Sequence, residues 1–154
     1  MNKVAAYCGS FDPFTKGHLS VYLKAKELFS DVVIVVANNP QKKRFTNVEE
    51  MADMIRVATG ATVVVESGLV ALYCKRNGIK HSVRGLRGTS DYLYEEELSK
   101  ANKLIYSELD TVYFRAEDDG ISSTLVRLLH EQGEDADAYL PDGVTLGGHD
   151  RFNG

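Results

Sequence analysis

The chain has 154 residues, of which 44% are hydrophobic and 26% are charged, and its formal net charge is −4. This composition is typical of a globular domain and excludes an intrinsically disordered chain. The acidic balance argues against a generic nucleic-acid-binding protein, which needs a basic surface. The longest purely apolar run, at residues 32–37, is far shorter than the ~18 residues that a membrane-spanning helix needs.

The two cysteines, Cys8 and Cys74, lie far apart in the sequence and form no CxxC pair, so no structural zinc site is expected. The N-terminus passes straight into a strand-like segment and lacks the apolar stretch and cleavage site of a secretory signal. Two ordinary thiols in such a chain predict the reducing cytoplasm. We therefore expect a cytoplasmic protein with no membrane and no nucleic-acid partner.

Segments with strand and helix patterns alternate along the chain. Short apolar runs rich in β-branched residues predict strands, and apolar positions at helical spacing, such as Met51, Met54 and Ile55, predict helices. The predicted strands cover residues 4–8, 32–37, 62–65, 79–83 and 111–115, and the predicted helices cover residues 18–29, 47–59, 69–76, 90–105 and 122–132.

Residue types at the helix ends indicate how these helices begin. Thr46 followed by Glu49 predicts a capping box at the start of the second helix. Thr89 or Ser90 is expected to cap the fourth helix, and Ser122 is expected to cap the fifth.

Strands that alternate with helices predict an α/β fold, a doubly wound parallel sheet of five strands with helices on both faces. No linker or repeat interrupts the chain, so we expect a single domain at residues 1–144, followed by a flexible tail at residues 145–154. In such sheets, ligands bind at the carboxyl ends of the strands. The loops to search are residues 9–18, 38–46, 66–69, 84–91 and 116–123.

The first loop reads GSFDPFTKGH and contains neither GxGxxG nor GxxxxGK[ST], so a dinucleotide fingerprint and a Walker A loop are absent. Gly9 and Gly17 allow close backbone approach, and Ser10 offers a hydroxyl group. His18 lies where a helix begins, so its ring can join exposed backbone N–H groups that favour an anion. A turn with a structural histidine is the alternative, and the whole pattern favours a phosphate-binding loop.

Cations gather in two further loops. The run of Lys42, Lys43 and Arg44 is typical of a solvated turn, but its position after a strand makes anion binding equally plausible. Arg84 directly follows the predicted fourth strand, and Arg87 comes three residues later. Two guanidinium groups suit bidentate phosphate recognition, and two surface arginines are the alternative. On the helix that follows, Tyr92, Leu98 and Leu104 are expected to pack in the core.

The fifth loop ends in three hydroxyl-bearing residues, at positions 122–124, and Arg127 follows one turn later. Hydroxyl groups at a helix N-terminus cap the helix, bind phosphate, or do both. The cluster together with Arg127 favours a polyphosphate site.

These motifs together resemble the nucleotidylyltransferase superfamily. GSFDP at residues 9–13, followed by Gly17 and His18, is similar to its HxGH-type motif, and ISST at residues 121–124 with Arg127 is similar to its ISSTxxR-type motif. A narrower likeness is RGLR at residues 84–87 followed by DYLYE, which resembles the RGLR…DFEYE pattern of phosphopantetheine adenylyltransferases.

The resemblance implies a Rossmann-like domain, usually assembled as a hexamer, that serves coenzyme A biosynthesis. The implied reaction transfers the adenylyl group of ATP, with Mg²⁺ carried by ATP, to 4′-phosphopantetheine and gives dephospho-coenzyme A and pyrophosphate. It implies that His18 and Lys42 are catalytic and that the protein supplies no metal site of its own. The implied contacts to 4′-phosphopantetheine are Ser10, Lys42, Val70 and Arg84. The implied contacts to ATP are Ser10, Phe11, His18, Gly85, Leu86, Arg87, Glu95, Asp118, Asp119, Gly120, Ile121, Ser122, Ser123 and Thr124.

The sequence departs from the family pattern at several places. Cys8 stands where a proline is usual, and Ser10 replaces a threonine while keeping the hydroxyl group. An aromatic-containing stretch is replaced by DDG at residues 118–120. Residues 66–73 are expected to line a groove for the long pantetheine arm.

Three other interpretations stay open. A nucleotidylyltransferase acting on nicotinamide mononucleotide shares the first and last motifs but does not need the block at residues 84–95. A non-catalytic nucleotide-binding regulatory module would be expected to have replaced His18 or Lys42, and both are present. A flavodoxin-like scaffold leaves the cations and hydroxyl groups after the strands unexplained.

Overall fold

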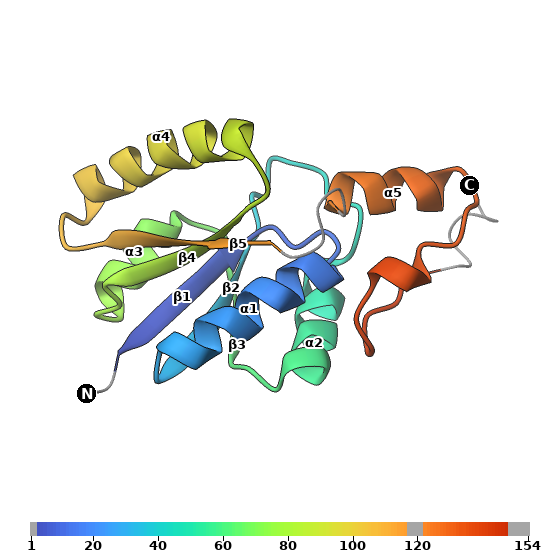
Figure 1. Cartoon of the computed structure of the whole chain (residues 1–154), viewed down its shortest axis with the longest axis horizontal. Coiled ribbons are helices and arrows are strands. Elements are labelled where there is room, and N and C mark those ends of the chain that lie inside the picture. Colours follow the sequence, from blue (N-terminus) through green and yellow to red (C-terminus); the bar gives the residue numbers. More distant parts are fainter. Residues whose placement is uncertain (1–2, 117–121, 148–154) are drawn as a thin grey trace.

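The computed structural model describes residues 3–116 and 122–147, and strands and helices alternate throughout (Figure 1). Within this part of the chain, no helix is both long and apolar enough to cross a bilayer. The strands are β1 (Val4–Gly9), β2 (Asp31–Ala37), β3 (Val63–Glu66), β4 (His81–Leu86) and β5 (Asp110–Arg115). The helices are α1 (Lys16–Leu28), α2 (Val48–Thr59), α3 (Val70–Arg76), α4 (Thr89–Ile105) and α5 (Ser123–Glu131), followed by the short 3₁₀ helix η1 (Asp137–Tyr139).

The five strands form one parallel sheet in the order β3-β2-β1-β4-β5. The chain winds outward from β1 through β2 to β3, then returns to the other side of β1 and continues through β4 to β5. The winding direction therefore reverses between β1 and β4, and the crevice at the carboxyl ends of these strands is where such sheets bind ligands. This topology confirms the predicted doubly wound, parallel five-stranded sheet.

Helices cover both faces of the sheet (Figure 1). Successive side chains of a strand point to opposite faces, and β1 shows this directly. Tyr7 packs in one buried cluster with side chains of α1, α2 and α5. Cys8 packs in a second buried cluster with Ala71 and Cys74 of α3. Two apolar layers, one on each face of the sheet, thus pack around β1.

β4 ends three residues later than the sequence predicts. It runs to Leu86, so Arg84, Gly85 and Leu86 are strand residues rather than the start of a loop. Their pairing with β5 brings Arg84 opposite Tyr113 and Gly85 opposite Phe114. Charged residues and glycine are depleted in strands, but here the ladder to β5 overrides that local preference.

Two of the three predicted helix caps are wrong. α2 is capped by Asn47, whose side chain accepts a hydrogen bond from the Glu50 N–H at 3.0 Å, because the Thr46 hydroxyl is engaged by Asp12. α4 begins after Gly88 and has no side-chain cap. The third prediction is confirmed, since the Ser122 hydroxyl accepts from the Leu125 N–H at 3.0 Å.

α4 is more exposed than its sequence predicts. The expectation that Tyr92, Leu98 and Leu104 pack in the core is wrong, since they are 43%, 37% and 90% exposed. Among the described side chains of α4, only that of Glu95 is buried. α4 lies along the edge pair β4 and β5, so only a narrow face of the helix meets the sheet.

The segment after η1 returns to α2. The backbone N–H of Thr145 lies 3.3 Å from the sulfur of Met54, and Leu146 packs against the core. The rest of the predicted tail, residues 148–154, lies outside the described residues.

Candidate active site

Three cavities meet at the carboxyl ends of β1 and β4, and Arg84 lines all of them. The His18 cavity, of about 280 Å³, is bordered by Phe11, His18, Gly85, Arg87 and Glu95. The Lys42 cavity, of about 860 Å³, is bordered by Ser10, Lys42, Lys43 and Arg127. The Val70 cavity, of about 250 Å³, is bordered by Gly68, Leu69, Val70, Leu98 and Asn102. The topology thus gathers residues from four predicted loops at one place.

His18 is the third residue of α1 and takes part in the helix cap. The backbone N–H of Thr15 donates to Nδ1 of His18 at 2.9 Å, and the Thr15 hydroxyl accepts from the His18 N–H at 3.4 Å. Because Nδ1 accepts, the ring proton of the neutral imidazole lies on Nε2. The spacing Thr15-x-x-His18 could have indicated this reciprocal cap, with histidine in the place of the usual Glu or Gln.

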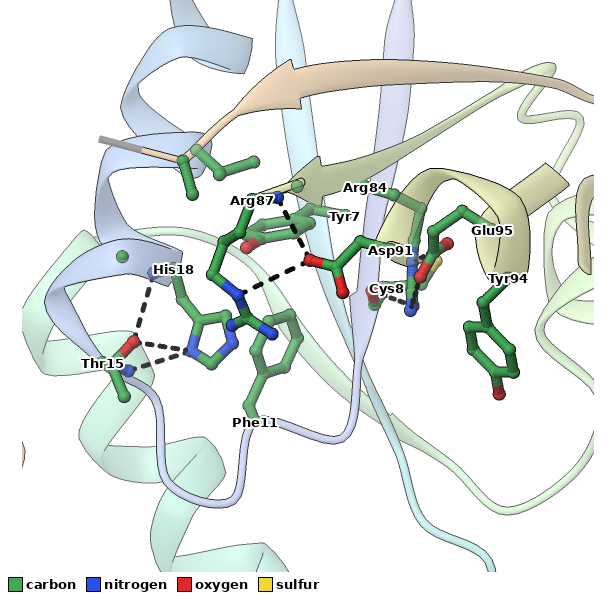
Figure 2. Close-up of a pocket in the computed structure, with 14 residues that line it drawn as sticks. Tyr7, Cys8, Phe11, Thr15, His18, Arg84, Arg87, Asp91, Tyr94 and Glu95 are labelled. Atoms are coloured by element: carbon green, nitrogen blue, oxygen red, sulfur yellow. Dashed lines mark hydrogen bonds and ion pairs between the residues drawn. The ribbon is translucent and has the colours of Figure 1, made fainter. Parts of the chain in front are cut away.

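The His18 ring packs against two aromatic rings, of which Figure 2 shows that of Phe11. It stacks on Phe14 at 5.5 Å and meets Phe11 edge-on at 5.0 Å between ring centroids. Burial, followed by the positive charges of Arg87 and Arg84, lowers the pKa of His18 from 6.5 to about 3. His18 is therefore a neutral hydrogen-bond donor at neutral pH, not a cation.

The loop before α1 is tightly built around Phe11. Phe11 adopts a φ of 47° and is 2% exposed. This left-handed conformation is strained for a bulky residue and persists where the surroundings enforce it. A side chain at Gly9 would bring a Cβ within 3.1 Å of the Phe11 ring, so glycine gives the ring its space. Ser10 remains exposed at the Lys42 cavity.

Arg84 is fixed by an ion pair with Glu95 (Figure 2). Its Nε and Nη2 donate to the two carboxylate oxygens at 2.8 and 2.7 Å, and Nη1 donates to the Cys8 carbonyl at 2.8 Å. Burial alone would lower the pKa of Arg84, but the hydrogen bonds and charge of Glu95 outweigh burial, and the pKa is raised. The sequence assigned these two side chains to different ligands, and the structure brings them together.

Arg87 pairs with Asp91 at the entrance of the His18 cavity (Figure 2). Its Nε lies 3.5 Å from Oδ2 of Asp91, and its backbone N–H donates to the same oxygen at 3.1 Å. The Arg87 side chain is 41% exposed, so this pair is open to exchange for a stronger anionic ligand.

The three cations of the Lys42 loop have different environments. Lys42 and Lys43 are exposed, and neither ammonium group has an ion pair with any described residue. Arg44 is instead largely buried and donates to the carbonyl oxygens of Ser10 and Phe11. The predicted anion-binding run is therefore reduced to the two lysines.

The hydroxyl groups at the start of α5 all have protein partners. The Ser122 hydroxyl caps the helix, and the Ser123 hydroxyl donates to the Pro13 carbonyl at 2.7 Å. The Thr124 hydroxyl accepts from Nη2 of Arg127 at 3.2 Å. The remaining predicted contacts of this segment, Asp118, Asp119, Gly120 and Ile121, lie outside the described residues.

The Val70 cavity is bounded by the turn that follows β3. Glu66 shapes this turn, since its carboxylate accepts from the Gly68 N–H at 2.8 Å and from Arg76 at 2.7 Å. The Gly68 N–H in particular holds the pKa of Glu66 below its ordinary value. Side chains of α4, including Leu98 and Asn102, form the opposite wall.

Known proteins share both the motifs and the fold. The family model for cytidylyltransferase-like proteins matches residues 6–129. The phosphopantetheine adenylyltransferase of Cytophaga hutchinsonii is 37% identical over 147 residues, covering 92% of this chain and 98% of that protein. The enzyme of the same name from Heliobacterium modesticaldum is 38% identical, covering 92% of this chain and 88% of that protein. The chain belongs to the phosphopantetheine adenylyltransferase family. The resemblance inferred from RGLR and DYLYE is thereby confirmed.

A solved structure supports the fold. The bifunctional NMN adenylyltransferase/ADP ribose pyrophosphatase from Francisella tularensis superposes with a TM-score of 0.67 at 20% identity. The match covers 94% of this chain but only 46% of that enzyme, so this chain spans about half its length. At this identity, the likeness establishes the shared Rossmann-like fold and nothing more about this phosphopantetheine adenylyltransferase family member.

Proposed function

We propose that the chain is the nucleotidyltransferase that transfers the adenylyl group of ATP to 4′-phosphopantetheine and releases pyrophosphate. Family membership supports this function. The observation that favours it most within the site is the meeting of three cavities at Arg84. Two elongated substrates that react through their phosphates need two binding cavities joined at one cationic centre.

The reaction needs little from the protein beyond position and charge. The phosphate of 4′-phosphopantetheine is already an anionic nucleophile, so no general base is required. It attacks the α-phosphorus of ATP in line, the bond to the β-phosphate breaks, and pyrophosphate leaves. Catalysis then consists of proximity and of electrostatic stabilisation of the transition state.

His18 supplies the hydrogen bond that strengthens as charge builds on the α-phosphate. Its Nδ1 is occupied by Thr15, so Nε2–H is the donor available to the His18 cavity. A pKa lowered to about 3 by burial and by Arg87 and Arg84 makes the ring neutral, so that it donates a hydrogen bond without carrying a charge. The residue therefore acts by hydrogen bonding rather than by acid catalysis.

Lys42 and Arg84 hold the acceptor phosphate. A guanidinium has five N–H groups, of which three in Arg84 donate to Glu95 and Cys8. The remaining two, on Nη1 and Nη2, suit a phosphate at the junction of the cavities. Lys42 reaches the same junction from the exposed loop and bridges the two reacting phosphates.

The remaining contacts divide between the two substrates. The Val70 cavity, with its apolar walls, takes the pantetheine arm. The His18 cavity takes ATP, with Ser10, Phe11, Gly85, Leu86, Glu95 and Arg87 around the nucleotide, and residues 118–124 remain expected ATP contacts. Arg87 exchanges Asp91 for the phosphates of ATP.

Mg²⁺ enters with ATP in this proposal and neutralises charge on the phosphates. Mg²⁺ keeps several waters and binds phosphate oxygens readily. The donor set of the site suits such a carried ion, because the carboxylates of Asp91 and Glu95 already pair with Arg87 and Arg84. No group of three or more candidate metal ligands occurs among the described residues.

We also propose a homohexamer in the cytoplasm. Exposed leucines of α3 and α4 support self-association, namely Leu72, Leu93 and Leu104, which are 40%, 63% and 90% exposed. The free thiols of Cys8 and Cys74 suit a reducing compartment.

The acceptor is tested by measuring pyrophosphate release. Purified protein with ATP and Mg²⁺ is given either 4′-phosphopantetheine or nicotinamide mononucleotide. We expect turnover with the first acceptor and none above background with the second, because a mononucleotide needs a second base and ribose site. The reverse result would refute the acceptor while leaving adenylyl transfer intact, and no turnover with either would favour the regulatory module.

A further inference from the structure

A buried carboxylate ties the loop before α1 to the Lys42 loop. The Asp12 side chain is 13% exposed. It accepts hydrogen bonds from the backbone N–H groups of Phe45 and Thr46, both at 2.8 Å, and from the Thr46 hydroxyl at 2.6 Å. Three donors from one loop thus converge on one carboxylate of the other loop.

Arg44 makes the same connection in the opposite direction. Its side chain is 12% exposed. Nη1 donates to the Ser10 carbonyl at 2.7 Å, Nη2 donates to the Phe11 carbonyl at 3.3 Å, and Nη2 lies 3.6 Å from the Asp12 carboxylate. We call this reciprocal pair, Asp12 and Arg44, the clasp.

The clasp also reaches α5. Nη1 of Arg127 donates to the Asp12 carbonyl at 2.6 Å, and the Ser123 hydroxyl donates to the neighbouring Pro13 carbonyl at 2.7 Å. The segment of residues 10–13 is therefore held from two sides. Its geometry is fixed before any ligand binds.

Lys42 depends on the clasp for its position. Its side chain is exposed and has no described partner of its own, so only its backbone sets where the ammonium group lies. In a local turn, the Asn39 carbonyl accepts a hydrogen bond from the Lys42 N–H at 3.0 Å. On the other side of Lys42, the next anchored residues are Arg44, Phe45 and Thr46, all of them held by the clasp.

We propose that Asp12 and Arg44 are positioning residues for adenylyl transfer, which hold Lys42 at the reaction centre beside Ser10 and His18. This inference rests on the proposed function. Neither side chain needs to touch a substrate, because each is already committed to the protein. Their effect on the reaction passes through Lys42.

A double-mutant cycle tests that dependence. Arg44→Gln should lower kcat about 10–100-fold, since a misplacement of about 1 Å can cost ~10²-fold. It should raise the KM for 4′-phosphopantetheine and change the KM for ATP less than about three-fold. In a Lys42→Ala background, Arg44→Gln should lower kcat further by less than about two-fold. Additive losses would overturn the proposal, because a purely structural residue would weaken both backgrounds equally.

Thr46 offers a milder pair of variants in case Arg44→Gln does not fold. Thr46→Val removes one donor to Asp12, whereas Thr46→Ser keeps it. We expect Thr46→Val, like Arg44→Gln, to raise the KM for 4′-phosphopantetheine more than the KM for ATP. Thr46→Ser should behave as the wild type. Arg56→Gln is the matched control, since Arg56 also donates to a backbone carbonyl, that of Val63, but lies away from the cavities. Equal kinetics for Thr46→Val and Thr46→Ser would contradict the role.

Hydrogen exchange tests the clasp without any substrate. The amide protons of Phe45 and Thr46 should exchange at least about ten-fold faster in Asp12→Ala, which removes both acceptor oxygens, than in the wild type. Unchanged exchange would show that the clasp does not hold the loop. If the wild type released no pyrophosphate with 4′-phosphopantetheine, the proposed function would fail, while this measurement would still decide on the clasp.

Discussion

His18 joins two tasks that are usually separate in a protein. One ring nitrogen closes the cap of α1 and the other faces the cavity. The sequence places His18 at a helix start. It did not indicate that His18 takes part in the cap, because the capping motif usually has Glu or Gln at this position. A substitution at His18 therefore changes both the reaction and the beginning of the helix.

His18→Ala should lower kcat by about 10²–10³-fold, the scale for losing one hydrogen-bond donor to a developing charge. It should also lower the free energy of unfolding by about 1 kcal/mol, typical of a lost helix cap. Pyrophosphate release and urea unfolding measure the two effects. His81→Ala is the control, because His81 lies at the opposite end of β4 beside Phe29. Near-normal turnover in His18→Ala would refute the role.

The same variant has a signature in the pH dependence of stability. The pKa of His18 is about 3 in the folded state against an ordinary 6.5. Between these values, the unfolded chain binds a proton that the folded chain excludes, so the free energy of unfolding falls as the pH falls. Above pH 6.5 this effect vanishes. We expect acid to destabilise the wild type more than His18→Ala across this window, and parallel curves would contradict the buried neutral ring.

At the scale of elements, the carboxyl end of β4 presses closely against α1. A Cβ at Gly85 would lie 2.8 Å from Cγ2 of Val21, a side chain that is 1% exposed. Glycine at this position lets the strand that carries Arg84 run directly beside the helix that carries His18. The family resemblance implies that Gly85 contacts ATP, and the structure shows in addition a close approach of a helix at this glycine.

Gly85→Ala should lower the free energy of unfolding by about 1–3 kcal/mol, the usual cost of overpacking, and should raise the KM for ATP. In a Val21→Ala background, which makes room for the added Cβ, Gly85→Ala should lower the free energy of unfolding by less. Gly88→Ala is a matched control, since a Cβ there meets nothing within 4 Å. Thermal unfolding measures the change in stability, and steady-state kinetics measure the KM for ATP. Equal costs of Gly85→Ala in the two backgrounds would exclude Val21 as the cause.

The order of elements could be predicted from the sequence, whereas several side-chain partnerships could not. Alternating patterns and turn residues are local signals, and they located all five strands and five helices. The Arg84–Glu95 pair joins residues 11 positions apart, and the Asp12–Arg44 clasp joins two separate loops. Such pairs arise only when the sheet brings strand ends together. Residue types alone therefore indicated candidate phosphate ligands but not the internal partners that hold these side chains in place.

At the scale of the whole molecule, charge is unevenly distributed. The chain carries a net charge of −4, yet Lys42, Lys43, Arg84 and Arg127 border one cavity. A cationic cleft in an acidic protein focuses the field where anionic substrates must enter. The acidic remainder of the surface disfavours nonspecific binding of nucleic acid.

The assembly can be tested through α4. Leu104→Asp combined with Leu93→Asp places charges on its exposed face, and we expect the proposed hexamer to dissociate because charged groups resist burial at an interface. Val57→Asp is the control, since Val57 is 77% exposed on α2. Light scattering should give six times the mass of one chain for the wild type and the control, and a smaller mass for the double variant. An unchanged mass would assign the interface elsewhere.

Arg84 has a consequence for inhibitor design. This one side chain borders all three cavities, so the cavities proposed for the two substrates meet at a single guanidinium group. A compound with an anion beside Arg84 and one arm in each flanking cavity would occupy both substrate sites at once. Such a compound would compete with both substrates.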